Sequence, residues 1–426
     1  MTHIEIKEGI LDLWMKSYHG RSEQLTLLVD TYFKDELTVY HAIDSKIVGA
    51  IMGIPYKFGY GENCLKGLFL YGLIVEEKFR HRGIMSGMLK EINEKVSNDY
   101  DFTFLIPVSD LNADFYRRRG YFNSFFLLEE RFTSVHDFYN DFIYTLAPAD
   151  QRVKSLKESL YDGIKIEKFD GLSTINPERI IDFIIKWETK ATMRVELQHS
   201  RKDLAIILND NGVNDNSIFV SIAPDENITG VAFVEKHELK RLKVRSLYVE
   251  DACSYFAVLN HIKKTYPDYS ISLFVERARY NNPSIIEETY GASNPDGGDL
   301  DTLFGLYDTQ FDVSRLMEPY GMVKLLRFDR ILEYIASRHK EINLKLFIRD
   351  WSNPQISKES LFIVNNGKVK VEPADFNKFH KDQNILKLSA KEVTEILLRK
   401  KESSSVIMEA FGIPRLPLSM KLMPKI

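Results

Sequence analysis

The chain has 426 residues, a length that predicts about two to four domains, each able to bury a core of its own. Charged residues make up 28% of the sequence and hydrophobic residues 44%, which is the balance of an ordinary globular protein. The formal net charge of −4 argues against a general nucleic-acid-binding protein and favours cationic small molecules or exposed lysines as partners.

Signals for membranes, secretion and metals are missing. The longest apolar run, residues 67–75, is far short of the roughly 20 residues that cross a bilayer. The first residues lack the basic and apolar regions of a secretory signal. Cys64 and Cys253 lie far apart, so they predict neither a disulfide scaffold nor a metal site. We therefore expect a cytoplasmic protein with no membrane partner and no metal.

The N-terminal region alternates helices and strands. The predicted elements are helices over 9–16 and 23–33, strands over 37–43, 46–58 and 65–75, a helix over 83–96, a strand over 102–107 and a short helix over 112–118. A strand–helix–strand unit stands at the centre of this order. The pattern therefore predicts a twisted mixed sheet covered by helices on both faces.

The segment from about 156 to 327 repeats this theme, with a strand over 243–249, a helix over 254–264 and a strand over 270–275. The two copies differ in charge after the first strand. The first copy has Arg80, His81, Arg82 and Gly83 there, whereas the second has Glu250 and Asp251. Because carboxylates repel a pyrophosphate, we expect the second copy to keep the fold without a cofactor site.

The last hundred residues predict a small α+β layer. A helix over 328–337 precedes strands over 343–351 and 360–365, and Asn366-Gly367 is a strong hairpin signal into a strand over 368–372. Ser389 and Glu392 have the spacing of a capping box, which predicts a helix over 390–400.

The most informative segment is residues 73–89, where an apolar strand breaks into an arginine-rich turn at Gly83 and restarts as a helix. The helix after Gly83 carries one apolar stripe, made of Ile84, Met85, Met88, Leu89, Ile92 and Val96. Its unpaired N–H groups, together with Arg80 and Arg82, are suited to bind a diphosphate. A second local pattern follows one strand later, Phe115-Tyr116-Arg-Arg-Arg-Gly120-Tyr121.

These two segments resemble the signature segments of the GNAT acetyltransferases. In that family the first holds the pyrophosphate of acyl-CoA and the second supplies a tyrosine. The whole chain is similar to the enhanced-intracellular-survival (Eis-like) acetyltransferases, including the phrase at 319–323. The resemblance implies an α/β plus α+β protein: a catalytic GNAT domain over 1–148, a degenerate GNAT copy over 149–322 and a sterol-carrier-protein-like domain over 323–426.

The resemblance also implies a set of residues that bind acetyl-CoA. They are Leu73, Ile74, Val75, Arg80, His81, Arg82, Gly83, Ile84, Met85, Ser86, Ser109 and Asp110. Met85 stands where GNAT proteins usually have glycine or alanine, which indicates a slightly different backbone path at that point.

Acetyl transfer to an amine needs a proton donor for the leaving thiolate and a base for the amine. Tyr116 matches the family's general acid, and a phenol of pKa ~10 is protonated at neutral pH; the competing interpretation is a core aromatic. Glu76 and Glu77, after the central strand, are two candidate bases or merely solvated carboxylates. The resemblance offers a third candidate, the C-terminal carboxylate of Ile426.

The predicted function is acetyl-CoA-dependent N-acetylation of an amine in lysine side chains, polyamines or aminoglycoside-like compounds. A longer-chain N-acyltransferase is one alternative, because N-myristoyltransferases also pair two GNAT folds and use a terminal carboxylate. A non-catalytic acyl-CoA-binding regulator is another. The resemblance further implies a homo-oligomer, with the hexamer as the family's assembly.

Overall fold

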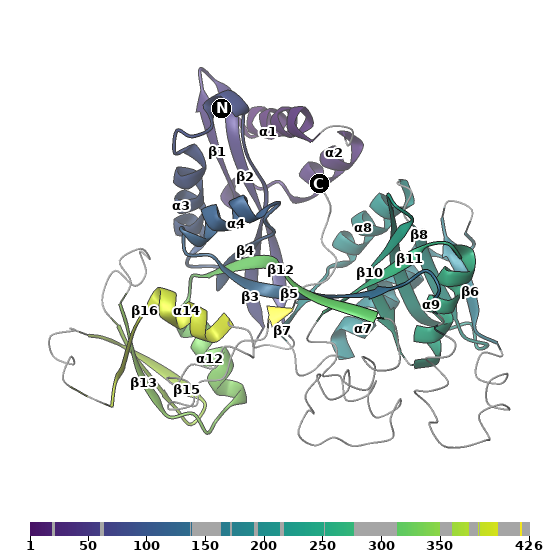
Figure 1. Cartoon of the computed structure of the whole chain (residues 1–426). Helices are drawn as coiled ribbons and strands as arrows, with labels where there is room; N and C mark the ends of the chain where they lie inside the picture. The colour runs from purple at the N-terminus through teal and green to yellow at the C-terminus, as the bar shows by residue number, and fades with distance from the viewer. Residues whose placement is uncertain are drawn as a thin grey trace.

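The computed structural model describes residues 1–18, 22–59, 64–136, 138, 163–170, 173–190, 195–213, 217–250, 252–276, 313–349, 360–374, 382, 384–398 and 418–419. Within this part, the strands form a 13-stranded mixed sheet and a separate four-stranded sheet. Helices pack against both sheets (Figure 1). No helix among these residues is long and apolar enough to cross a membrane.

The first unit contains the predicted strand–helix–strand core. Its elements are α1 (His3–Ser17), α2 (Ser22–Tyr32), η1 (Asp35–Leu37), β1 (Thr38–Ile43), β2 (Lys46–Phe58), β3 (Leu65–Val75), η2 (Glu77–Phe79), α3 (Ile84–Val96), β4 (Phe102–Leu105) and α4 (Asp110–Arg117). Helices α1 and α2 cover one face of the sheet, and α3 and α4 cover the other (Figure 1). Asp44 and Ser45 both have positive φ, as the tight turn between β1 and β2 requires.

The second unit repeats this arrangement. It consists of β6 (Lys165–Phe169), α7 (Pro177–Lys190), β7 (Val195–Gln198), α8 (Arg201–Val213), β8 (Ser217–Ile222), β9 (Ile228–His237), β10 (Arg241–Val249), α9 (Ala252–Thr265) and β11 (Ser270–Glu276). Strands β10 and β11 are parallel and α9 connects them, just as α3 connects the parallel strands β3 and β4. The two units are thus mixed sheets with flanking helices, as expected.

Two long strands, β5 (Phe122–Phe132) and β12 (Val313–Leu325), join the units and were not predicted. The strand order β3-β4-β12-β5-β11-β10 places this antiparallel pair at the centre of the large sheet. One end of β12 pairs with β4 of the first unit, whereas β5 pairs with β11 of the second. The expected domain boundary between 322 and 323, and the phrase at 319–323, therefore fall inside β12, where the ladder with β5 is irregular around Pro319 and Gly321.

The C-terminal layer is an α+β unit. Its strands are β13 (Leu344–Arg349), β14 (Ser360–Asn365), β15 (Lys368–Pro373) and β16 (Leu386–Ser389), with α12 (Phe328–Arg338) and α14 (Ala390–Leu398) on one face. Asn366 and Gly367 have φ of 47° and 75°, which confirms the predicted hairpin turn. The Ser389–Glu392 capping box is also confirmed, because the hydroxyl of Ser389 accepts from the Glu392 N–H and the Glu392 carboxylate accepts from the Ser389 N–H.

The core of this layer continues into the first unit. Leu325, Phe328 and Ile331 belong to the same apolar cluster as Phe58 and Phe104. A last short strand, β17 (Leu418–Ser419), pairs with β7, which itself pairs with the end of β2. The C-terminal region therefore packs against the first unit through this shared core, and its last strand joins the large sheet at β7 of the second unit.

Candidate active site

Strand β3 extends beyond the end of its partner β4 at the centre of the first unit. They pair only from Gly67 to Phe69 with Phe102 to Phe104, although β3 continues to Val75. The register between β2 and β3 shifts between Ala50 and Met52, so that β3 carries one extra residue there. Gly72 lies in this bulge with a φ of +62°. The bulge therefore lies in the part of β3 that extends beyond its pairing with β4, toward the turn at Gly83.

The indole of Trp14, on α1, packs against this bulge. Its indole Nε1 donates a hydrogen bond to the carbonyl of Gly72 at 3.1 Å, and its ring meets Tyr71 edge-on. A Cβ on residue 72 would come within 2.0 Å of the Trp14 ring. Glycine is therefore required at position 72 both by the positive φ and by the close approach of the indole.

The turn after β3 has the shape of an anion-binding loop. His81 and Gly83 have φ of 63° and 80°, and Gly83 is the N-cap of α3 without a side-chain cap. Gly87 N–H donates to the Gly83 carbonyl in the first bond of the helix. The N–H groups of Ile84, Met85 and Ser86 consequently have no partner within the helix. Residues alternating between right- and left-handed backbone direct such N–H groups toward one point, which suits a phosphate.

The arginines of this turn donate hydrogen bonds to backbone carbonyls that precede the turn. Arg80 Nε donates to the carbonyl of Val75 at 3.1 Å, and Arg82 donates to the carbonyl of Lys78 at 3.3 Å. The guanidinium of Arg82 also lies 5.2 Å from the ring centre of Phe79. Both side chains are exposed at their charged ends, and the first turn of α3 contains no acidic residue. The site is therefore cationic and fits a diphosphate.

The remaining predicted cofactor residues lie along the same edge of the sheet. Leu73 and Ile74 are half-buried against opposite cores, and Val75 is buried. Ser109 is the N-cap of α4, where its hydroxyl accepts from the N–H of Asn112 at 3.3 Å, and Asp110 follows in the first turn. Because β3 and β4 are parallel, the N-termini of α3 and α4 lie at the same edge. The structure thus brings these residues to one side of the sheet, and their role in cofactor binding stays a prediction.

Tyr116 on α4 is buried, with 8% of its surface exposed, between Phe115 and Tyr121. Burial raises the pKa of its phenol well above 10, and the nearby phenols of Tyr121 and Tyr18 raise it further. Its hydroxyl makes no hydrogen bond to any of the described residues. Tyr121 differs, since its hydroxyl is held by Asn93 and Thr103 at 3.1 and 3.0 Å. Both tyrosines belong to the same core cluster, and they differ in that only the hydroxyl of Tyr121 is bonded among the described residues, so the role of Tyr116 as a proton donor stays a prediction.

The two glutamates after β3 differ in their surroundings. Glu76 pairs with Lys46 at 2.7 Å and Lys78 at 3.2 Å, and the hydrogen bond from Lys46 is the main reason that the pKa of Glu76 is lowered. Glu77 is exposed in η2. Ile426 lies outside the described residues, so the third candidate base has no described geometry.

One residue at this site was missed by the sequence reasoning. Arg119, in the run of arginines after Tyr116, donates through Nε and Nη2 to the hydroxyl of Ser86 at 3.1 and 2.5 Å. Its Nη1 donates to the carbonyl of Phe115 at 2.6 Å. It thereby connects the first turn of α3 with α4. The only signal in the sequence was its place within the Phe-Tyr-x-x-x-Gly-Tyr motif.

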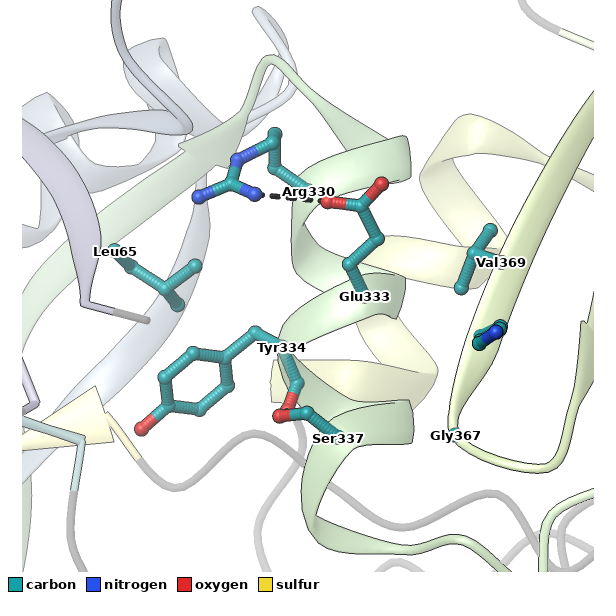
Figure 2. A pocket seen from close by; sticks show the side chains of 8 residues that line it. Leu65, Arg330, Glu333, Tyr334, Ser337, Gly367 and Val369 are labelled. Atoms are coloured by element: carbon teal, nitrogen blue, oxygen red, sulfur yellow. Dashed lines mark hydrogen bonds and ion pairs between the residues drawn. The ribbon is translucent and has the colours of Figure 1, made fainter. Parts of the chain in front are cut away.

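A cavity of about 360 Å³ lies elsewhere, between the first unit and the C-terminal layer. Arg330, Glu333, Tyr334 and Ser337 line it from successive turns of α12, and Leu65 faces them (Figure 2). Leu65 is the first residue of β3, whereas the cationic turn follows its last. Because a strand rises about 3.3 Å per residue, the two sites are roughly 30 Å apart. No cluster of metal-ligating side chains is found in the described part of the chain.

The first unit matches a known family in sequence. Residues 4–122 fit the family model of the acetyltransferase (GNAT) domain, and this span contains the turn at Gly83 and Tyr116. The first unit is thus an acetyltransferase domain of the GNAT type, a class that uses acetyl-CoA and acts on amines of small molecules or proteins. No curated protein matches the sequence significantly.

Three solved structures resemble the fold along nearly the whole chain. A probable N-acyltransferase from Enterococcus faecalis V583 has a TM-score of 0.66 at 13% identity, over 96% of this chain and 90% of that one. A GCN5-related N-acetyltransferase from Kribbella flavida has a TM-score of 0.65 at 13% identity, over 99% and 98%. Eis1 from Mycobacterium abscessus has a TM-score of 0.62 at 11% identity, over 97% and 91%. At such identities the likeness concerns the fold.

Proposed function

We propose that the chain is an acetyl-CoA-dependent N-acetyltransferase whose single acyl-transfer site lies in the first unit. The observation that carries this proposal is the combination at one sheet edge of a cationic turn, a bulged strand that leads into it and a tyrosine with an unpartnered hydroxyl. The turn binds the diphosphate, the last residues of β3 contact the pantetheine arm, and Tyr116 lies on the helix beyond β4.

The proposed reaction requires a proton donor and a base from this chain. The neutral amine attacks the thioester carbonyl, and the tetrahedral intermediate expels the CoA thiolate. Tyr116 donates its proton to that sulfur, since a phenol with a raised pKa is fully protonated at neutral pH. The amine must lose one proton to a base, and the proton balance then closes through solvent.

For the base we propose the α-carboxylate of Ile426. Two observations support it: Glu76 is engaged by two lysines, and Leu418 and Ser419 in β17 pair with β7, the strand that pairs with the end of β2. The residues from 420 to 426 can span at most about 25 Å when extended. An exposed α-carboxyl has a pKa of about 3.5, so this base requires a buried setting that raises it. Appending a few residues after Ile426 should cut turnover sharply and leave acetyl-CoA binding intact; parental turnover in the extended chain would return the search to Glu76, Glu77 or a water chain.

The overall proposal is tested by measuring thiol release from acetyl-CoA with the full chain and a panel of amines: a lysine peptide, a polyamine and an aminoglycoside. Amine-dependent thiol release supports the proposal and identifies the acceptor. Release with a long-chain acyl-CoA but not with acetyl-CoA would establish a longer-chain N-acyltransferase. Tight CoA binding without release for any amine or acyl chain would indicate a regulator instead.

A further inference from the structure

We propose that Arg119 is a positioning residue of the cofactor site, which fixes the Ser86 hydroxyl as a hydrogen-bond donor to the cofactor's diphosphate and links that contact to the helix carrying Tyr116. The inference rests on the proposed function, because it assumes that the turn at Gly83 binds acyl-CoA.

The first step of the argument is the geometry of one hydroxyl group. Ser86 Oγ accepts two hydrogen bonds from Arg119, from Nε at 3.1 Å and from Nη2 at 2.5 Å. A serine hydroxyl has two acceptor lone pairs and one proton, so both lone pairs are used and the proton must point away from the guanidinium. No acceptor for this proton is found among the described residues. Ser86 is the third residue of α3, beside the N–H groups that have no partner within the helix.

The second step concerns charge. A cation near a helix N-terminus is unfavourable, because the helix dipole is positive there. The guanidinium of Arg119 nevertheless bonds to the first turn of α3, which contains no acidic residue and has no side-chain cap. Burial and, after it, the neighbouring charge of Arg118 lower the pKa of Arg119, so its surroundings also disfavour the charged form. An anion bound at this turn would balance the helix terminus, Arg119 and the exposed arginines together.

The third step is the connection to Tyr116. The remaining guanidinium nitrogen, Nη1, donates to the Phe115 carbonyl at 2.6 Å, and the guanidinium stacks 3.4 Å from the centre of the Phe115 ring. Phe115 precedes Tyr116 on α4 and meets its ring edge-on. A diphosphate that orders Ser86 therefore also orders the segment that carries the general acid.

The neighbouring arginines provide a matched control within the same run. Arg117 pairs with Asp114, and Arg118 bonds to the Asp114 carbonyl at 3.4 Å. Both are exposed, whereas Arg119 is half-buried. A change of Arg118 to lysine thus alters the same surface without touching Ser86 or Phe115.

The experiment titrates CoA into the full-length wild type, Arg119→Lys, Ser86→Ala, the double variant and Arg118→Lys, using calorimetry. Arg119→Lys and Ser86→Ala should each weaken CoA binding about tenfold, the scale of one hydrogen bond to a charged group. The double variant should be within about threefold of either single variant, since the two residues form one unit. Arg118→Lys should bind like the wild type.

Turnover provides a second readout that a merely structural role would not move. Because only Arg119 also holds Phe115, Arg119→Lys should lower kcat more than Ser86→Ala does. Wild-type CoA affinity in Ser86→Ala, or full additivity in the double variant, would overturn the inference even if Arg119→Lys failed to fold. A wild type that binds no CoA would instead overturn the proposed function, and the two failures are thus distinguishable.

Discussion

The two strand–helix–strand units share a supporting tryptophan but differ in the connection between the supported strand and the next helix. In the first unit Trp14 of α1 donates to the carbonyl of Gly72 at 3.1 Å, and in the second Trp187 of α7 donates to the carbonyl of Val249 at 2.7 Å. Each indole also packs edge-on against a tyrosine of the same strand. The distance between ring centres is 5.4 Å for Tyr71 and 5.3 Å for Tyr248. This correspondence shows that the second unit is a structural repeat of the first.

After this shared feature the units diverge. In the first, β3 continues through Leu73 to Val75, and η2 and the cationic turn separate it from α3. In the second, β10 ends at Val249 and α9 begins at Ala252, so that no turn of comparable length remains. Glu250 occupies the short connection and pairs with Lys186 at 3.7 Å. The second unit thus has the tryptophan-supported strand but not the cationic turn that follows this strand in the first unit.

The largest expected effect tests this difference by charge reversal. Arg80→Glu with Arg82→Glu should weaken acetyl-CoA binding by on the order of 10³-fold or more, because two charge-assisted contacts are replaced by repulsion. Glu250→Ala in the second unit should leave the affinity unchanged. Calorimetry with acetyl-CoA measures the affinity of both variants. Unchanged affinity in the double charge reversal would mean that the turn is not the anion-binding site.

Two tyrosines of the first unit provide the next effect. Tyr116→Phe should keep acetyl-CoA affinity within a few-fold and lower kcat by roughly 10²-fold, the scale of losing a general acid. Tyr121→Phe should instead cost about 1–3 kcal/mol of unfolding free energy, because its hydroxyl is bonded to Asn93 and Thr103, and should spare turnover. Steady-state kinetics and denaturant titration separate the two. Near wild-type kcat in Tyr116→Phe would mean that water or another group protonates the thiolate.

Local patterns in the sequence predicted the parts of the site that are contiguous in the chain. The strand over 65–75, the turn at Gly83 and the helix to Val96 follow from apolar periodicity and a glycine within three residues of two arginines, and the structure has them at those bounds to within one residue. The capping box at Ser389 was predictable for the same reason.

Contacts between distant segments were beyond such patterns. The ladder of β12 with β5 and β4 joins residues about 180 to 220 positions apart, and an apolar stretch does not specify which strand it pairs with. The ion pairs that make Glu76 a weaker base could not be predicted either, because Lys46 lies on a neighbouring strand. The tryptophan repeat had a faint signal, since Trp14 and Trp187 both lie near the end of the first helix that the structure describes in their units.

The tryptophan pair gives a third and smaller effect. Trp14→Phe and Trp187→Phe should each cost about 1–3 kcal/mol of unfolding free energy, because a buried carbonyl loses its donor. Only Trp14→Phe should also weaken acetyl-CoA binding, since Gly72 lies in the bulge of the strand that leads into the cationic turn. Thermal unfolding and calorimetry on both variants make the comparison. An equal loss of cofactor affinity in Trp187→Phe would mean that the second unit contributes to the site.

The smallest expected effect is the flatness of the pH profile. If the first unit alone carries the chemistry, the acid that limits turnover at high pH is Tyr116, which must be protonated to act. Burial raises its pKa above the ordinary value of about 10, so protonation is complete below that pH and is lost only above it. At saturating acetyl-CoA and acceptor, kcat should therefore not fall between pH 8 and pH 10. The raised pKa also determines how stability depends on pH. The unfolded chain releases the Tyr116 proton first as the pH rises past 10, so the free energy of unfolding decreases only above that pH. A descending limb of kcat centred near pH 8 or 9, with the protein still folded by circular dichroism, would assign the proton transfer to a group of lower pKa than this buried phenol.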